Sequence, residues 1–149
     1  MKKLFEELQN TVSGEILYDE LSLGMYSTDA SIYQIKPIAI VLPRNEDDIK
    51  SAIKVAFDNG ITILPRGAGT SLAGQTVGKS IILDFSKHMN SIIEINESEK
   101  WVRVQPGMAR DDLNAVLEPL GLHFAPDPAT SSRANVGGMV GNNSSGTKS

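Results

Sequence analysis

The spacing of hydrophobic and polar residues predicts a series of short strands and helices. A continuous apolar run at residues 38–42 has the length of a buried strand and is followed by Pro43. Asn45 is suited to cap a helix, Gly60 to end it, and a second apolar run follows at residues 61–64. The pattern therefore predicts a βαβ unit with a right-handed crossover. Its helical apolar positions are Ile49, Ala52, Ile53 and Ala56.

Three further strand candidates follow this βαβ unit. They occupy residues 81–84, 92–95 and 101–104, and a five-residue polar connection separates the last two. That short connection predicts an antiparallel hairpin. Trp101 opens the last of these strands, and we expect its ring to pack in the core.

Helices are expected near both ends of the chain. Residues 1–34 combine a short amphipathic helix with irregular structure, and a brief helix is expected at residues 135–140. Another helix begins after Pro106-Gly107 and is ended by Pro119 and Gly121. The residues expected on the buried face of that helix are Leu113, Val116 and Leu117.

Composition narrows the possible functions. The 149 residues carry a net charge of −4 without a basic cluster, which argues against a nucleic-acid partner. The absence of cysteine excludes disulfides, thiolate catalysis and iron–sulfur ligation by these residues. Apolar runs are too short for a transmembrane segment, and we expect a cytoplasmic protein, with peripheral attachment to the inner membrane left open. Surface or structural roles are expected for the two histidines, His88 and His123, and no metal site is predicted.

A glycine-rich loop at residues 66–78 is the first candidate for chemistry, because it follows a predicted buried strand directly. Its glycines would let backbone N–H groups converge into a nest for a phosphate or pyrophosphate, although a flexible connection is the alternative. A Walker A spacing begins at Gly69, but Gln75 stands where the phosphate-binding lysine is needed. The dinucleotide fingerprint also fails, because Leu72 replaces its third glycine.

A second small-residue segment at residues 127–138 supplies hydroxyl groups, backbone donors and paired glycines. Together the two segments could bind a large anionic ligand from two sides. Either segment alone is a weak signal, whereas both in this order are more specific.

Four stretches resemble the FAD-binding domain of the vanillyl-alcohol oxidase and p-cresol methylhydroxylase (PCMH) type, in its glycolate oxidase and D-lactate dehydrogenase branch. They are PRGAGTSLAG at 65–74, VRVQPG at 102–107, FAPDP at 124–128 and VGGMVGNNSSG at 136–146. The resemblance implies an α+β fold of the FAD-binding PCMH type, in which a small parallel βαβ subdomain packs on a mixed or antiparallel subdomain. Residues 35–149 would be the N-terminal part of that domain, and residues 1–34 a lead-in.

The resemblance also implies which residues contact FAD. The pyrophosphate loop corresponds to residues 66–71, and the second contacting stretch to residues 128–146. Relatives that attach FAD covalently place a histidine where this chain has Thr70, so FAD is expected to be bound non-covalently. The departure at Asn135, where many relatives carry threonine, leaves that side chain without an assigned contact. The residues expected to bind FAD are Arg66, Gly67, Ala68, Gly69, Thr70, Ser71, Pro128, Ser131, Ser132, Gly137, Gly138, Asn142, Ser145 and Gly146.

By the same resemblance, the chain is the FAD-binding portion of a flavin-dependent 2-hydroxyacid dehydrogenase acting on D-lactate, glycolate or D-2-hydroxyglutarate. The family's catalytic residues and metal ligands fall beyond residue 149, so none is assigned here and the chain alone is expected to be inactive. Expected partners are a small 2-hydroxyacid bound by another domain, an electron acceptor or iron–sulfur region, and a second copy of the fragment. The alternatives are a flavin-free member of the fold and a P-loop-like nucleotide binder.

Overall fold

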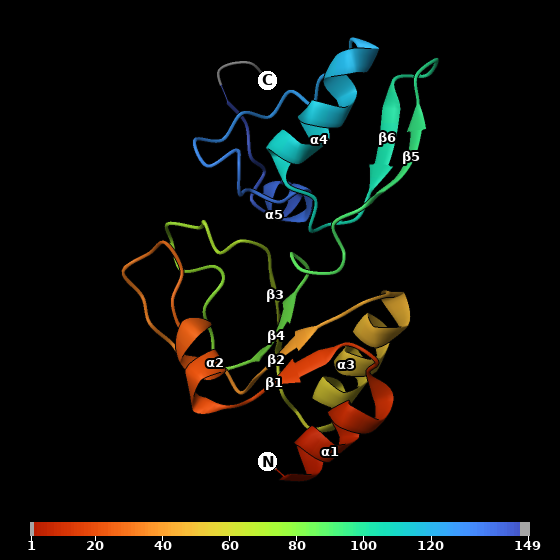
Figure 1. Ribbon diagram of the computed structural model, residues 1–149. Helices are drawn as coiled ribbons and strands as arrows, with labels where there is room; N and C mark the ends of the chain where they lie inside the picture. The colour runs from red at the N-terminus through yellow and green to blue at the C-terminus, as the bar shows by residue number, and fades with distance from the viewer. Residues whose placement is uncertain (1, 147–149) are drawn as a thin grey trace. The chain divides into compact units, whose positions relative to one another are not determined.

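The computed structural model describes residues 2–146, and the chain divides into two compact units, residues 1–85 and residues 86–149 (Figure 1). The first unit holds α1 (Lys2–Thr11), β1 (Glu15–Leu17), α2 (Glu20–Met25), β2 (Ala39–Leu42), α3 (Glu46–Asp58), β3 (Ile63–Arg66) and β4 (Ile81–Asp84). The second holds β5 (Ile92–Asn96), β6 (Trp101–Val104), α4 (Arg110–Leu117), the 3-10 helix η1 (Glu118–Leu120) and α5 (Val136–Gly141).

The first unit is built on a four-stranded mixed sheet in the order β1-β2-β4-β3. Strands β2, β4 and β3 are parallel, and β1 pairs antiparallel with β2. The expected strand–helix–strand unit is present, but β2 and β3 are not neighbours because β4 lies between them. All residues of β2 and β4 are buried, which agrees with their continuous apolar sequences.

Alternate residues of the central strands face two separate cores, because side chains of a strand alternate between the faces of its sheet. One face packs against α1 and α3, and the other against α2. On the first face Ala39, Val41, Ile81 and Leu83 meet Leu4, Leu8, Ala52 and Ala56, whereas on the second Ile40, Leu42 and Ile82 meet Leu23.

Helix α3 begins as its sequence predicts. Asn45 has extended backbone, and its Oδ1 accepts a 2.9 Å hydrogen bond from the N–H of Asp48. The carboxylate of Asp48 then turns outward from the helix and accepts bonds from the N–H groups of Ser13 and Arg44 at 2.7 and 2.8 Å. This buried carboxylate joins the start of α3 to the segment between α1 and β1.

The second unit pairs β5 and β6 as the expected antiparallel hairpin, with a core centred on Met108, Leu113 and Leu117. Two sequence predictions are wrong here. Val116 is 46% exposed, because Arg110, Leu113 and Leu117 form the buried stripe of this short helix and Val116 lies to one side of it. Trp101 is only partly buried and outside the core; its indole N–H bonds to Glu99, and its ring lies beside the Arg103 guanidinium.

No helix within residues 2–146 is long and apolar enough to cross a membrane.

Candidate nucleotide-binding site

The glycine-rich loop leaves the end of β3, which lies at the edge of the first sheet. The N–H groups of residues 67–72 donate no hydrogen bond to any other residue in the range 2–146. Gly69 has φ +69°, a left-handed conformation that glycine adopts without strain. A run of unpaired backbone donors at the carboxyl end of a parallel strand is suited to an anion such as phosphate.

Arg66, the first residue of the predicted pyrophosphate loop, directs its guanidinium at the backbone. Its Nη2 donates to the carbonyl of Thr28 at 2.8 Å, and its Nη1 to the carbonyls of Thr76 and Tyr26 at 3.1 and 3.3 Å. The guanidinium carbon also lies 5.2 Å from the centre of the Tyr26 ring. This side chain therefore joins the loop to the segment after α2.

Tyr26, whose ring lies beside the Arg66 guanidinium, is hydrogen-bonded to Asp84. The Tyr26 hydroxyl donates a 2.6 Å hydrogen bond to Oδ2 of Asp84, a buried residue at the end of β4. Burial raises the pKa of Tyr26, and the bond to the Asp84 carboxylate raises it further. The phenol consequently stays protonated and holds the start of the segment after α2 against the sheet.

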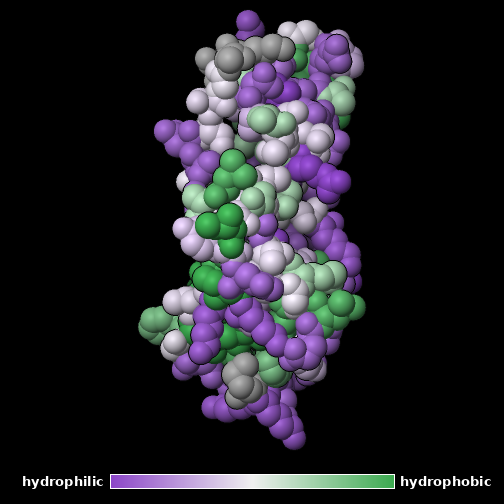
Figure 2. Space-filling model, turned by 90° about the vertical axis from the view of Figure 1, so that its left-hand side faces the viewer, coloured by the Kyte–Doolittle hydropathy of each residue, from purple (hydrophilic) through white to green (hydrophobic). Residues whose placement is uncertain are grey.

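Several apolar side chains are exposed in the glycine-rich loop and in the segments around α2. Figure 2 views the side of the first unit that carries α2 and the loops, where green hydrophobic patches lie among purple hydrophilic residues. An apolar surface next to unpaired N–H donors suits a ligand that has aromatic rings as well as a charged group. The exposed apolar residues of these segments are Leu21, Met25, Ile32, Ile35 and Leu72.

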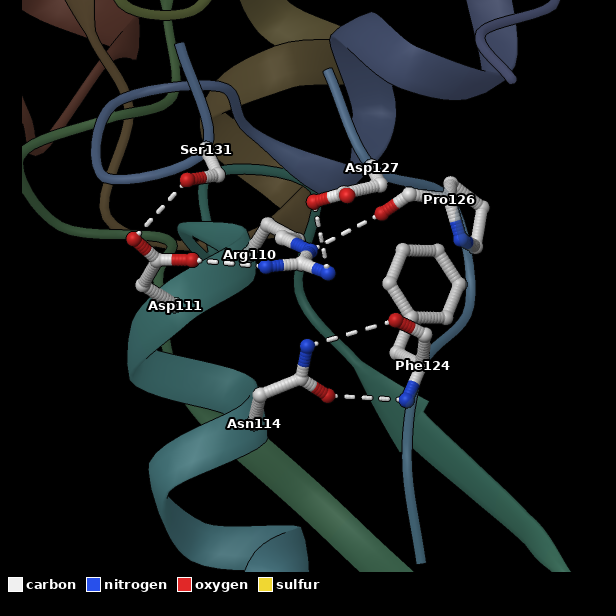
Figure 3. Close-up of polar contacts among 7 residues, drawn as sticks. All are labelled: Arg110, Asp111, Asn114, Phe124, Pro126, Asp127 and Ser131. Carbon is white, nitrogen blue, oxygen red and sulfur yellow. Dashed lines mark hydrogen bonds and ion pairs between the residues drawn. The ribbon is translucent and has the colours of Figure 1, made fainter. Parts of the chain in front are cut away.

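In the second unit, the segment that connects η1 to α5 is held by side chains of α4 (Figure 3). Arg110 is buried; its Nε donates to the carbonyl of Pro126 at 2.8 Å, and its two Nη atoms lie 3.0 Å from carboxylate oxygens of Asp111 and Asp127. Asp111 in turn accepts a 3.0 Å bond from the hydroxyl of Ser131.

The glycines of the second predicted stretch differ in the space around them for a side chain. A side chain on Gly137 would lie 2.7 Å from Cβ of Pro106, and the N–H of Gly137 already donates to the Pro106 carbonyl. Gly146 approaches Asp127 equally closely. A Cβ on Gly138 would have no atom of residues 2–146 within 4 Å, apart from its chain neighbours and the backbone of its own helix. Close packing therefore explains Gly137 and Gly146, whereas Gly138 has open space around it.

The other residues expected to contact a ligand lie at or near the surface. Pro128, Ser145 and Ser132 lie in irregular or turn segments, and Asn142 follows α5 directly. Asn135, which received no assigned contact, is buried. Its Nδ2 donates to the Gly107 carbonyl at 2.7 Å, and its Oδ1 accepts no hydrogen bond from residues 2–146.

The structure thus gathers Arg66 to Ser71 in the first unit and the stretch from 128 to 146 in the second. Sequence reasoning missed Arg110 and Asn114, which hold residues 124–127 at the start of the second stretch, because a lone arginine or asparagine in a helix gives little signal. A shallow groove of about 400 Å³ lies beside α1, and none of the expected site residues lines it. Within residues 2–146 no cluster of acidic residues and histidines could hold a metal ion.

Sequence comparison identifies the family. The sequence model of the FAD binding domain matches residues 37–149, and the chain belongs to that family. The chain is 43% identical over 148 residues to a D-2-hydroxyglutarate dehydrogenase of Pseudomonas putida, covering 97% of this chain and 15% of the relative. It is 37% identical to the glycolate oxidase subunit GlcD of Bacillus subtilis, covering 92% of this chain and 30% of the relative.

Structural comparison confirms the expected fold. Substrate-bound p-cresol methylhydroxylase superposes on 95% of this chain with a TM-score of 0.73 at 20% identity, and the match spans 28% of that structure. The mixed parallel and antiparallel α/β architecture is thus that of the FAD-binding PCMH type. The chain spans less than a third of the length of these relatives.

Proposed function

We propose that the chain binds FAD non-covalently, and that the N–H groups of residues 67–71 bind its pyrophosphate. The unpaired state of these donors is the observation that carries the proposal. The residues fit the group, because the glycines keep side chains away from the nest and the hydroxyls of Thr70 and Ser71 add further donors.

The second stretch is also proposed to contact FAD. Residues 128–146 carry hydroxyl groups, the amide of Asn142 and the open space at Gly138, and they follow a segment that Arg110 holds in place. In this proposal residues 35–149 are the N-terminal part of the FAD domain, and residues 1–34 lead into it. The residues of this stretch proposed to contact FAD are Pro128, Ser131, Ser132, Gly137, Gly138, Asn142, Ser145 and Gly146.

For the whole protein we propose a flavin-dependent 2-hydroxyacid dehydrogenase, supported by the relatives' names. Bound FAD would accept a hydride from the substrate's hydroxyl-bearing carbon. The residues of this chain would bind and orient the cofactor. For the whole protein, we propose a 2-hydroxyacid substrate, an electron acceptor or iron–sulfur region as partner, and a cytoplasmic location. Substrate oxidation is tested with D-2-hydroxyglutarate, glycolate and D-lactate on the full-length protein, and the 149-residue chain alone should be inactive.

The first experiment is a titration of FAD into this chain and into the same chain extended through the rest of its flavin domain. Quenching of flavin fluorescence measures binding, and acid denaturation of the complex should release all flavin, because the attachment is non-covalent. Folded chains that both fail to bind FAD would support a flavin-free member of the fold instead. Flavin that stays with the denatured protein would refute non-covalent binding.

A further inference from the structure

We propose that Arg66 is a positioning residue that holds the glycine-rich loop against residues 26–34, so that the loop's N–H groups are set for the pyrophosphate before FAD binds. This inference rests on the proposed function and deepens it, because it separates the residue that shapes the loop from the groups that contact the cofactor. It also brings residues that precede the matched family region, which begins at residue 37, into the site.

The donors of Arg66 are engaged within the protein. Three backbone carbonyls, those of Tyr26, Thr28 and Thr76, accept from its two Nη atoms. One of these carbonyls lies at the far end of the loop and the other two in the segment after α2. A planar guanidinium has donors in a fixed fork that can reach all three, whereas a lysine ammonium cannot reproduce this geometry.

Other contacts bind the same two segments together. The N–H of Ala30 donates to the carbonyl of Gly69 at 3.0 Å, and the hydroxyl of Thr76 donates to Oδ2 of Asp29 at 3.0 Å. Asp29 also accepts from the N–H of Ser31 at 2.8 Å. The contacts leave from both ends and the middle of the loop, so they fix its path as a whole.

Gly69 and Gly74 permit the close approach. A Cβ on Gly69 would lie 2.6 Å from Nη2 of Arg66, and one on Gly74 would lie 2.6 Å from Cδ2 of Tyr33. Both glycines have positive φ. The loop is thus folded around the guanidinium on one side and the Tyr33 ring on the other, with its N–H groups between residues 67 and 72 left unpaired.

The test compares Arg66→Met and Arg66→Lys with Arg44→Met in the 149-residue chain. Arg44 is exposed in the same unit, so its substitution makes the same change of charge away from the loop. Hydrogen exchange without FAD should be faster at Ala30 and Val77 in both Arg66 variants, because the N–H groups of these two residues donate to the loop carbonyls of Gly69 and Gly74. The N–H of Ile81, which bonds to Thr62 inside the sheet, should keep its protection and report an intact fold.

FAD titration is the second measurement. Both Arg66 variants should weaken binding by about tenfold or more, because the loop must be ordered on binding. The dependence of affinity on salt should match that of Arg44→Met, because no direct contact between Arg66 and phosphate is lost. A direct ionic contact predicts the opposite: Arg66→Lys would keep most of the affinity, and Arg66→Met would lose salt dependence beyond the Arg44 control.

The outcomes separate this inference from the proposed function. Unchanged exchange at Ala30 and Val77 in Arg66→Met would overturn the positioning role even if FAD binds. If the wild-type chain fails to bind FAD, the proposal that this chain binds FAD is overturned. Faster exchange in the Arg66 variants would still support the positioning role of Arg66. If Arg66→Met fails to fold, Thr76→Val removes only the bond to Asp29, and it should still speed exchange at Ala30 and weaken FAD binding by a few-fold.

Discussion

Asn114 binds both backbone groups of Phe124: its Nδ2 donates to the carbonyl at 3.2 Å, and its Oδ1 accepts from the N–H at 2.8 Å (Figure 3). A side chain of α4 thereby pairs with the backbone of the irregular segment after η1. The arrangement fixes the path of the chain toward residues 128–146, the second stretch proposed to contact FAD.

Asn114→Leu should lower the free energy of unfolding by about 1–3 kcal/mol. The substitution removes both bonds and leaves two partly buried backbone groups without partners. Urea denaturation measures the loss, and Asn10→Ala on the exposed side of α1 serves as the control, with an expected change within about 0.5 kcal/mol. Equal stability of the Asn114 variant and the wild type would contradict the role given to this amide.

Arg110→Met should destabilise the second unit by about 3 kcal/mol, because it leaves the Asp127 carboxylate and the Pro126 carbonyl facing a side chain without donors. Arg103→Met is the matched control: Arg103 pairs with Glu94 in solvent, with both side chains about half exposed or more. An exposed pair of this kind contributes at most about 1 kcal/mol. The two variants are compared by urea denaturation, and similar losses would show that burial of Arg110 has no energetic consequence.

The carboxyl group of Asp48 is expected to make the stability of the first unit depend on pH. Burial raises the pKa of its carboxyl, but the N–H groups of Arg44 and Ser13 outweigh burial, and the pKa lies below the ordinary value of 3.8. A depressed pKa stabilises the fold at pH values above 3.8, and this stabilisation is lost as the pH falls through the folded-state pKa. Asp48→Asn should therefore be less stable at neutral pH and lose less stability on acidification.

Unfolding free energies of the wild type and Asp48→Asn, measured from pH 7 to below pH 3, test this expectation. Glu46→Gln removes an exposed carboxyl from the same helical turn and should follow the wild type across the range. An Asp48→Asn variant that loses stability as steeply as the wild type would assign the acid sensitivity to other groups.

The sequence predicted most elements of the fold because their signals are local. The apolar run at 38–42, the cap at Asn45 and the hairpin connection each depend on neighbours in sequence, and β2, α3 and the β5–β6 hairpin are confirmed. The position of β4 between β2 and β3 was not predicted, because strand order depends on contacts between residues far apart in sequence.

The candidate site also has features that the sequence predicted and features that it did not. Its glycines were visible in the sequence because their spacing is unusual, but the inward direction of the Arg66 side chain was not. That direction depends on carbonyls from residues 26–28, some forty residues earlier in the chain. Arg110 escaped notice for a related reason, since its partners Pro126 and Asp127 become neighbours only after the second unit folds.

The adjacent glycines of α5 provide the sharpest steric test. Gly137→Ala should destabilise the protein by about 1–3 kcal/mol, because the new methyl would lie 2.7 Å from Cβ of Pro106 and also close to the Pro106 backbone. Gly138→Ala meets no atom and should raise stability by up to about 1 kcal/mol, since alanine favours a helix over glycine. Urea denaturation distinguishes the two, and equal effects would contradict the packing described for Gly137. FAD titration of Gly138→Ala then tests its open space: weaker binding by this stable variant would support a ligand contact there, and unchanged affinity would remove Gly138 from the proposed site.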